Sequence, residues 1–384
     1  MDSDSTDPLR AAPPGRTDRV AAGELSALLR RDTSGWRLLR PALLAFLIII
    51  AVGAAFGALA YAVAGGYQGW PTTVVRTAAG WRISSADGLQ QDSEMVAGSS
   101  MVWNNGGCLE LLDLGSGKTT VLQLPSSGEQ GSAAACLSER YVAWTTDRYP
   151  NDIDHLEIRA YDLVRRRLFT VPGTSDCDGS TPALSGSLLL WEGDSPQDTD
   201  AKHVVIHGLD LASGRGFPVA TGSIRLGGAC GDLVMWTQDD GNSARDQLTW
   251  VKDLSSSRLW RLRLCTGKGY ETDGCLLTGR ALVWQLDRDS TVTSASFTRI
   301  EELDLDSGVR RVVAQGNKVW GLSAGGGQVV WSGPSRAPLA ENVVGGPAVP
   351  LPVGRNFNGD LPVISDSAIA WIVDNTVETA RLSR

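Results

Sequence analysis

The hydrophobic and polar positions of this chain form short apolar runs separated by turn residues. The clearest stretch is residues 181–191, Thr-Pro-Ala-Leu-Ser-Gly-Ser-Leu-Leu-Leu-Trp, which predicts a strand, a tight Ser-Gly turn and a second strand that ends in Trp191. About twenty residues later, Leu-Asp-Leu-Ala-Ser-Gly at 209–214 predicts a third strand that ends in a hairpin turn. Strands joined by such short turns predict antiparallel sheets and an all-β fold.

The same unit recurs through the rest of the chain, and its second strand ends each time in tryptophan. These tryptophans are Trp103, Trp144, Trp191, Trp236, Trp284, Trp331 and Trp371, at spacings of 41, 47, 45, 48, 47 and 40 residues. A period of about 40–50 residues with several short strands in each unit is the mark of a β-propeller, in which one four-stranded sheet forms each blade. The third strand ends in Asp-Leu in the first five units, and this pair is missing from units six and seven.

Seven tryptophan strands predict seven blades of four-stranded antiparallel sheets over residues 81–384. Six blades are the alternative, if the weak sixth unit is not a full sheet. The last unit supplies only three strands. We therefore expect residues 81–85, Trp-Arg-Ile-Ser-Ser, to add the missing outer strand, because pairing the two ends of the ring removes its exposed sheet edges.

The repeat resembles a known family. Residues 182–214 are similar to the TolB-like β-propeller repeat, a WD-repeat-like family of bacterial envelope proteins, and residues 277–284 with 303–308 give the next best match. The resemblance covers residues 81–384. It implies an extracytoplasmic ring used for contacts with proteins or ligands, and it carries no catalytic residue onto this chain.

An uncharged segment at residues 41–65 precedes the repeats and is long enough to cross a bilayer, which takes about 20 apolar residues. The flanking arginines are Arg30, Arg31, Arg37 and Arg40 before it and Arg76 alone at a similar distance after it. The positive-inside rule then places the N-terminus in the cytoplasm and the propeller outside the plasma membrane. A cleaved signal peptide ending at residues 62–64 is the alternative. The length of the apolar run favours an uncleaved anchor.

These features predict four parts. Residues 1–40 form a mostly disordered cytoplasmic tail, residues 41–65 a single transmembrane helix, residues 66–80 a linker and residues 81–384 the propeller. A short amphipathic helix at 20–31 is expected within the tail.

Charge and motifs narrow the function. The formal net charge of −8 argues against a nucleic-acid-binding protein, which needs a basic surface. The run Gly115-Ser-Gly-Lys-Thr119 lacks the glycine that begins a phosphate-binding loop, so we expect a hairpin turn there. In Gly321-Leu-Ser-Ala-Gly325 a strand follows where a hydrolase elbow needs a helix. We therefore predict no catalytic residue, no cofactor, no metal site and no enzymatic activity.

Acidic residues concentrate in the loops of one predicted face. The loops from second to third strands and those from one blade to the next open on the same side of a propeller, which we call the top face. A site for a basic protein partner, a cation or a sugar is expected there. Its candidate residues are Asp178, Asp239, Asp240, Tyr270, Asp273, Asp287, Asp289, Trp320 and Phe357. The alternative is ordinary hairpin tips, where Asp is favoured by turn chemistry.

Six cysteines follow the apolar segment, an even number in a compartment that permits disulfides. Fifteen pairings are possible. We favour Cys265 with Cys275, because these residues flank one blade junction, then Cys108 with Cys136, which leaves Cys177 with Cys230. No Cys-x-x-Cys spacing occurs, so structural disulfides are favoured over a metal cluster.

The sequence thus predicts a membrane-anchored extracytoplasmic propeller that acts as a non-catalytic scaffold in the cell envelope and binds a protein partner or a small ligand. Two alternatives remain. One is an envelope enzyme that acts on glycan through channel acids such as Asp178 and Asp273. The other is a sensor that signals through the anchor to the helix at 20–31.

Overall fold

A computed structural model of the chain describes the region that holds the repeats. The described residues are 72–78, 80–84, 95–105, 108–123, 135–147, 156–175, 177, 181–194, 203–238, 247–265, 270–288, 297–333, 338–343, 345–351, 362–373 and 376–382. The predicted tail, the predicted transmembrane helix and the first residues of the linker lie outside them. None of the described residues belongs to a helix that could span a membrane.

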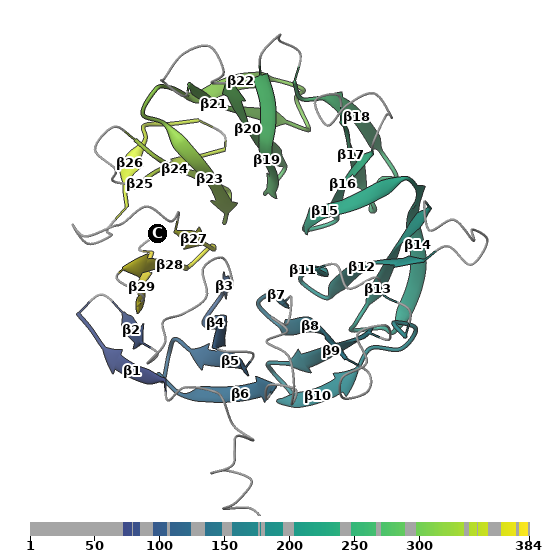
Figure 1. Cartoon of the computed structure of the whole chain (residues 1–384), viewed down its shortest axis with the longest axis vertical. Helices are drawn as coiled ribbons and strands as arrows, with labels where there is room; N and C mark the ends of the chain where they lie inside the picture. Colours follow the sequence, from purple (N-terminus) through teal and green to yellow (C-terminus); the bar gives the residue numbers. More distant parts are fainter. Residues whose placement is uncertain are drawn as a thin grey trace, which may run out of the picture. The chain divides into compact units, whose positions relative to one another are not determined.

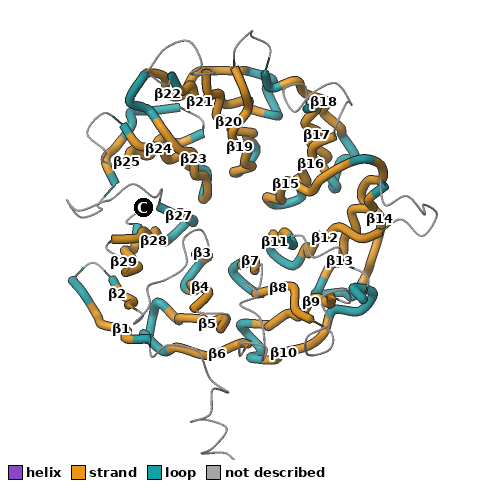
Figure 2. The backbone as a smooth tube through the Cα atoms, viewed as in Figure 1, coloured by secondary structure: helices purple, strands orange, loops and turns teal. Residues whose placement is uncertain are grey.

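Residues 67–384 form one compact unit, in which seven antiparallel sheets surround a central axis (Figure 1). Its described residues are strands and loops (Figure 2). The prediction of an all-β, seven-bladed propeller is confirmed, because the sixth unit is a full sheet.

The first three blades each have four strands, given from the inner to the outer strand. Blade 1 consists of β3 (Met95–Ala97), β4 (Ser100–Asn105), β5 (Cys108–Asp113) and β6 (Thr119–Gln123). Blade 2 consists of β7 (Ala135–Leu137), β8 (Tyr141–Asp147), β9 (Leu156–Asp162) and β10 (Arg167–Thr170). Blade 3 consists of β11 (Ala183–Ser185), β12 (Leu188–Asp194), β13 (Val204–Asp210) and β14 (Arg215–Gly222).

The next three blades repeat this order. Blade 4 consists of β15 (Ile224–Cys230), β16 (Leu233–Gln238), β17 (Leu248–Asp253) and β18 (Leu259–Arg263). Blade 5 consists of β19 (Tyr270–Thr278), β20 (Ala281–Arg288), β21 (Thr298–Asp304) and β22 (Arg310–Gly316). Blade 6 consists of β23 (Trp320–Gly325), β24 (Gln328–Ser332), β25 (Pro338–Asn342) and β26 (Val349–Pro350).

Blade 7 joins the two ends of the repeat region. Its inner strands are β27 (Val363–Ile364), β28 (Ala368–Val373) and β29 (Thr376–Arg381), and β2 (Trp81–Ser84) pairs with β29 as the fourth strand. The prediction that residues 81–85 would close the ring is therefore confirmed for residues 81–84. The sequence did not indicate that β1 (Thr73–Arg76), inside the predicted linker, would add a fifth strand beyond β2.

One backbone hydrogen bond recurs in all seven blades. The residue after the third strand donates its N–H to a carbonyl in the turn between the first two strands, as from Leu114 to Ser99 (2.8 Å) and from Leu305 to Arg280 (3.0 Å). In blades 6 and 7, Val343 and Leu382 make the same bond. The Asp-Leu pair missing from these units is thus replaced by Asn342-Val343 and Arg381-Leu382, since a backbone bond does not require a particular side chain.

The hydrophobic core lies between neighbouring blades, and each repeated tryptophan faces the blade that precedes it. Trp144 of blade 2 packs with Val102 and Leu109 of blade 1, and Trp331 of blade 6 packs with Val283 of blade 5. The indoles of Trp103, Trp144 and Trp284 are fully buried. The 40–50-residue period therefore reflects one buried aromatic residue per junction, with burial of such a side chain contributing about 1.5–3 kcal/mol.

The predicted disulfides require correction, because the structure shows no disulfide at any of the six cysteines. Side chains alternate between the two faces of a strand, and this alternation separates Cys136 from Cys108. Ala135 and Leu137 of β7 face blade 1, whereas Cys136 packs with Leu189 on the side of blade 3. Cys136 therefore points away from the blade that carries Cys108.

The other two predicted pairs are not formed either. Cys177 bridges Leu156 and Gly193 at the top ends of their strands, whereas Cys230 pairs with Leu233 at the bottom of blade 4. The Cys265 thiol donates to the carbonyl of Tyr270 (2.9 Å), and the Cys275 sulfur lies 3.4 Å from the sulfur of Met235. Burial raises the pKa of the Cys136 and Cys275 thiols, so both stay protonated and unreactive.

Candidate functional site

The predicted top-face site is only partly described. Asp178, Asp239, Asp240, Asp289 and Phe357 lie outside the described residues. Asp273 belongs to β19, and its side chain also lies outside them. Tyr270, Asp287 and Trp320 are described in full.

The directions of the strands place several acidic residues, which lie at strand ends, at the top face. Asp147 is the last residue of β8, and Asp194 is the last residue of β12. On blade 5, Glu271 of β19 is paired in register with Asp287 of β20. The Asp287 carboxylate accepts hydrogen bonds from Thr298 (2.7 Å) and from the amide of Gln285 (2.9 Å). The structure therefore holds the Asp287 carboxylate in a fixed position beside the strand that carries Glu271 and Asp273.

The two described aromatic candidates begin inner strands and pack between blades. Tyr270 contacts the hydrophobic cluster shared by blades 4 and 5, and Trp320 contacts the cluster around Ile369 and Trp371 of blade 7. Both side chains remain partly exposed. Their packing gives them a structural role in the described part of the ring, while their role in binding stays a prediction.

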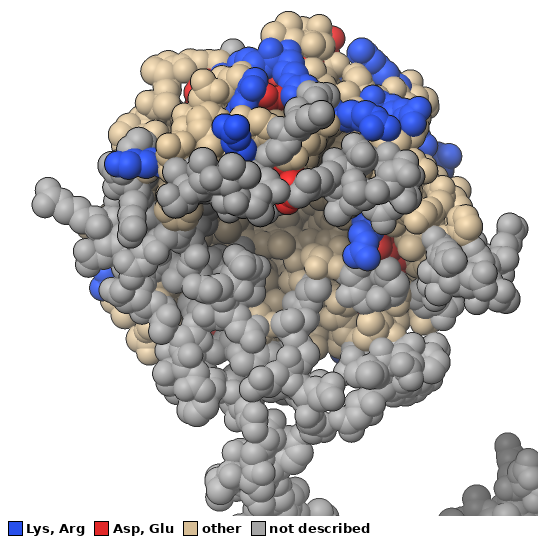
Figure 3. Space-filling view, turned by 45° about the horizontal axis from the view of Figure 1, so that its top comes forward, with Lys and Arg blue, Asp and Glu red and all other residues tan. Residues whose placement is uncertain are grey.

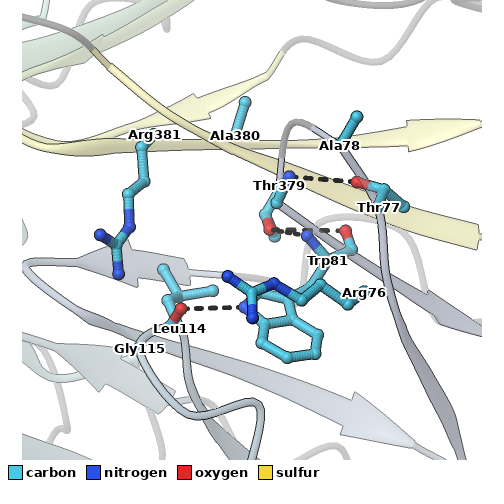
Figure 4. A pocket seen from close by; sticks show the side chains of 10 residues that line it. Arg76, Thr77, Ala78, Trp81, Leu114, Gly115, Thr379, Ala380 and Arg381 are labelled. Carbon is cyan, nitrogen blue, oxygen red and sulfur yellow. Dashed lines mark hydrogen bonds between the residues drawn. The ribbon is translucent and has the colours of Figure 1, made fainter.

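The opposite edge of the sheets, the bottom face, carries the hairpin turns and a pocket of about 220 Å³ (Figure 4). The pocket lies where blade 7 meets blade 1. It is lined by Arg76, Thr77, Ala78, Gly80 and Trp81 from β1, β2 and their turn, by Leu114 and Gly115 from the blade 1 turn, and by Thr379, Ala380 and Arg381 of β29. We call it the closure pocket.

Trp81 is held in the closure pocket by contacts with both blades. Its indole N–H donates to the carbonyl of Leu114 (2.9 Å), and its backbone N–H donates to the Thr379 hydroxyl (2.9 Å). The indole lies against Gly117, where an added Cβ would sit 2.2 Å from the ring. Only glycine permits this approach, and the φ of +74° at Gly117 also favours glycine.

Two guanidinium groups line the closure pocket. Arg76 lies over the Trp81 ring, 5.8 Å from its centroid, and both Arg76 and Arg381 reach toward the turn at residues 114–115 (Figure 4). Neither arginine has a carboxylate partner among the described residues. The Asp113 carboxylate nearby is bound to the backbone N–H groups of Gly115 (2.7 Å) and Ser116 (3.0 Å). The pocket therefore presents positive charge without a paired acid, which suits an anionic ligand.

The sequence prediction missed the closure pocket. Its signal is present in the repeat, because Arg381 occupies the position at which five earlier units have Asp. The turn at 114–117 itself was predicted, and the strand β6 that follows it confirms a hairpin where a phosphate-binding loop would need a helix.

Basic side chains also gather on the side of the ring where β18 and β22 lie (Figure 3). Several arginines of blades 4 and 5 have partners among the described residues. Arg310 donates to Glu301, Arg280 donates to Asp253 (2.9 Å) and Asp306 (2.8 Å), and Arg258 lies over Trp260. The described residues contain no group of three His, Cys, Asp or Glu side chains that could hold a metal ion.

Comparisons with known proteins give the fold. No protein-family model matches the sequence, and no curated protein matches it. An oligogalacturonate lyase in complex with manganese has a TM-score of 0.54 and 12% identity, over 82% of this chain and 97% of that chain. The propeller domain of the Trilobed protease from Pyrococcus furiosus has a TM-score of 0.48 and 11% identity, over 65% and 79% of the two chains. A chain from a study of two prolyl endopeptidases has a TM-score of 0.49 and 14% identity, over 74% of this chain and 44% of that chain.

At these identities the likeness establishes a β-propeller and no activity. It nevertheless corrects the prediction that the chain is not an enzyme. That prediction assumed that a propeller without a further domain serves for binding. The match covers 97% of the lyase chain, so the fold by itself does not exclude an enzyme.

Proposed function

We propose that the chain is a single-pass protein of the plasma membrane whose propeller lies in the cell envelope and binds a protein partner or a ligand through its top face. The uncharged segment at 41–65, with its arginine-rich N-terminal flank, supports the membrane anchor and the orientation. The resemblance of the repeat to the TolB-like family supports an envelope location. The net charge of −8 supports a partner other than nucleic acid.

The observation that carries the proposal is the placement of acidic residues at the top ends of several blades. Asp147 and Asp194 end the second strands of blades 2 and 3, and Glu271 and Asp287 are paired across two strands of blade 5. Acidic side chains gathered at one edge of the ring attract a basic protein partner or a cation.

The test is a crosslinking pull-down of the full-length protein from membranes at native expression. The variant carries Asp239→Asn, Asp240→Asn, Asp273→Asn and Asp289→Asn, which removes four charges expected at the top face. A matched control carries four changes at exposed acids of the bottom turns, namely Glu139→Gln, Asp232→Asn, Asp306→Asn and Asp366→Asn.

The proposal predicts a partner that is captured by the wild type and the control and lost from the top-face variant. Equal capture by all three proteins would contradict a role for the top face. Cleavage of a glycan by the purified protein, abolished by Asp178→Asn, would instead assign the ring a reaction.

A further inference from the structure

Two pockets of equal volume occupy equivalent places on the bottom face. The closure pocket lies between blades 7 and 1, and the second pocket, also about 220 Å³, lies between blades 2 and 3. Each is lined by the last residue of a third strand and by the residue after the third strand of the next blade. These residues are Arg381 and Leu114 in the closure pocket and Asp162 and Leu211 in the second pocket.

The two pockets differ in whether an acid faces their arginines. In the second pocket, Asp162 lies 3.7 Å from a guanidinium nitrogen of Arg140 and 4.0 Å from that of Arg165, so its cations face an acid. In the closure pocket the equivalent residue is Arg381, and Arg76 adds a second guanidinium group. The replacement of Asp by Arg at one position of the repeat therefore leaves the closure pocket without an acid among its lining residues, whereas the arginines of the second pocket face Asp162.

Hydrogen bonds hold two parts of the closure pocket in place. Trp81 is fixed by hydrogen bonds to Leu114 and Thr379, and its ring supports the Arg76 guanidinium group. The Thr77 hydroxyl accepts a bond from the N–H of Gly80 (3.0 Å), which fixes the turn between β1 and β2. A positioned guanidinium group loses little freedom when it binds an oxyanion, and it can donate two parallel hydrogen bonds.

We propose that the closure pocket binds a small molecule that carries a carboxylate or phosphate group. Two guanidinium groups, neither of which has a carboxylate partner among the described residues, supply the charge. The volume of about 220 Å³ exceeds an engineered cavity of about 150 Å³ that holds benzene, so the ligand reaches the size of a monosaccharide. This site lies on the bottom face and is independent of the partner proposed for the top face.

Titration of the full-length protein in detergent micelles, at constant ionic strength, tests this proposal by calorimetry. The probes are inorganic phosphate, glucose 6-phosphate and glucuronate, with glucose as the neutral comparison. The proteins are the wild type, Arg76→Gln, Arg381→Gln and the matched control Arg167→Gln, whose arginine lines the second pocket. Arg76 and Arg381 are exposed and have no carboxylate partner in the part of the chain that the structure describes, so their variants are expected to keep the thermal midpoint of the wild type in chloride buffer.

We expect the wild type and the control to bind at least one anionic sugar, and glucose to bind none of the proteins. Loss of one charge-assisted contact is worth about 1.5 kcal/mol, so each pocket variant should weaken binding about tenfold. A preference for phosphate over glucuronate, or the reverse, identifies the ligand's acidic group. Absence of saturable binding of any anion to the wild type, or equal binding by all four proteins, would overturn the proposal.

Discussion

At the scale of single residues, one turn position shows how the repeat uses backbone conformation. The residue four after the turn aspartate has a positive φ in five blades: +74° at Gly117 and Gly214, +73° at Gly308, +53° at Arg166 and +58° at Ser257. Among the three glycines of this set, only Gly117 also meets a neighbouring side chain, the Trp81 indole. In blade 3, glycine at position 214 is therefore favoured only by the positive φ of the turn. In blade 1, glycine at position 117 is favoured both by the positive φ and by the close packing of Trp81.

This difference predicts unequal effects of two identical substitutions. Gly214→Ala should cost about 1 kcal/mol of unfolding free energy, because alanine must adopt a positive φ in open space. Gly117→Ala should cost about 3 kcal/mol, because its Cβ also displaces Trp81. Urea unfolding of both variants measures the two costs. Equal losses would show that Trp81 does not lie against this turn.

At the scale of strands, charged side chains connect neighbouring blades. Arg311 of β22 donates to Glu302 of its own blade (2.6 Å) and to Glu341 of blade 6. The exposed fractions of the two carboxylate side chains are 2% and 9%. Burial raises the pKa of Glu302, and the hydrogen bond from Arg311 opposes this rise.

Arg311→Gln is therefore expected to destabilise the ring by about 2 kcal/mol at pH 7, less than a fully buried pair because Arg311 is partly exposed. A raised pKa of Glu302 means that its contribution to stability is complete below its usual pKa and is lost as the pH rises through the folded-state pKa. Loss of Arg311 raises that pKa further, so the deficit should grow between pH 4 and pH 7.

Thermal unfolding across this pH range tests the expectation. The control is Arg215→Gln, which removes an exposed arginine at the start of β14. A deficit that is independent of pH, or equal in the two variants, would rule out the bridge between blades 5 and 6.

At the scale of the whole ring, the closing strand provides a separate test. The side chain of Ile83 on β2 is fully buried in the cluster shared by blades 7 and 1, whereas Val75 on β1 is 52% exposed. Ile83→Ala should cost about 3 kcal/mol, and Val75→Ala should cost less than about 1 kcal/mol. Urea unfolding measures both, and similar costs would contradict closure through β2.

The sequence allowed the ring to be predicted because its signal repeats. Seven tryptophans mark seven buried junctions, and Trp81 begins a strand whose residues alternate in burial. The cysteine pairing could not be predicted, because it depends on which face of β7 carries Cys136. The closure pocket was missed because Arg76 and Arg381 lie 305 positions apart in the sequence and meet only when the ring closes.

The position of the ring relative to the membrane is the claim on which the proposed function depends most directly. Labelling by a membrane-impermeant maleimide tests it in wall-stripped cells with an intact plasma membrane. Asp239→Cys places a thiol in a top-face loop, Asp4→Cys places one in the predicted tail, and the wild type measures labelling of the native cysteines. The account predicts labelling above the wild type for Asp239→Cys in intact cells and for Asp4→Cys only after lysis. Labelling of Asp239→Cys only after lysis would place the ring in the cytoplasm and contradict the account.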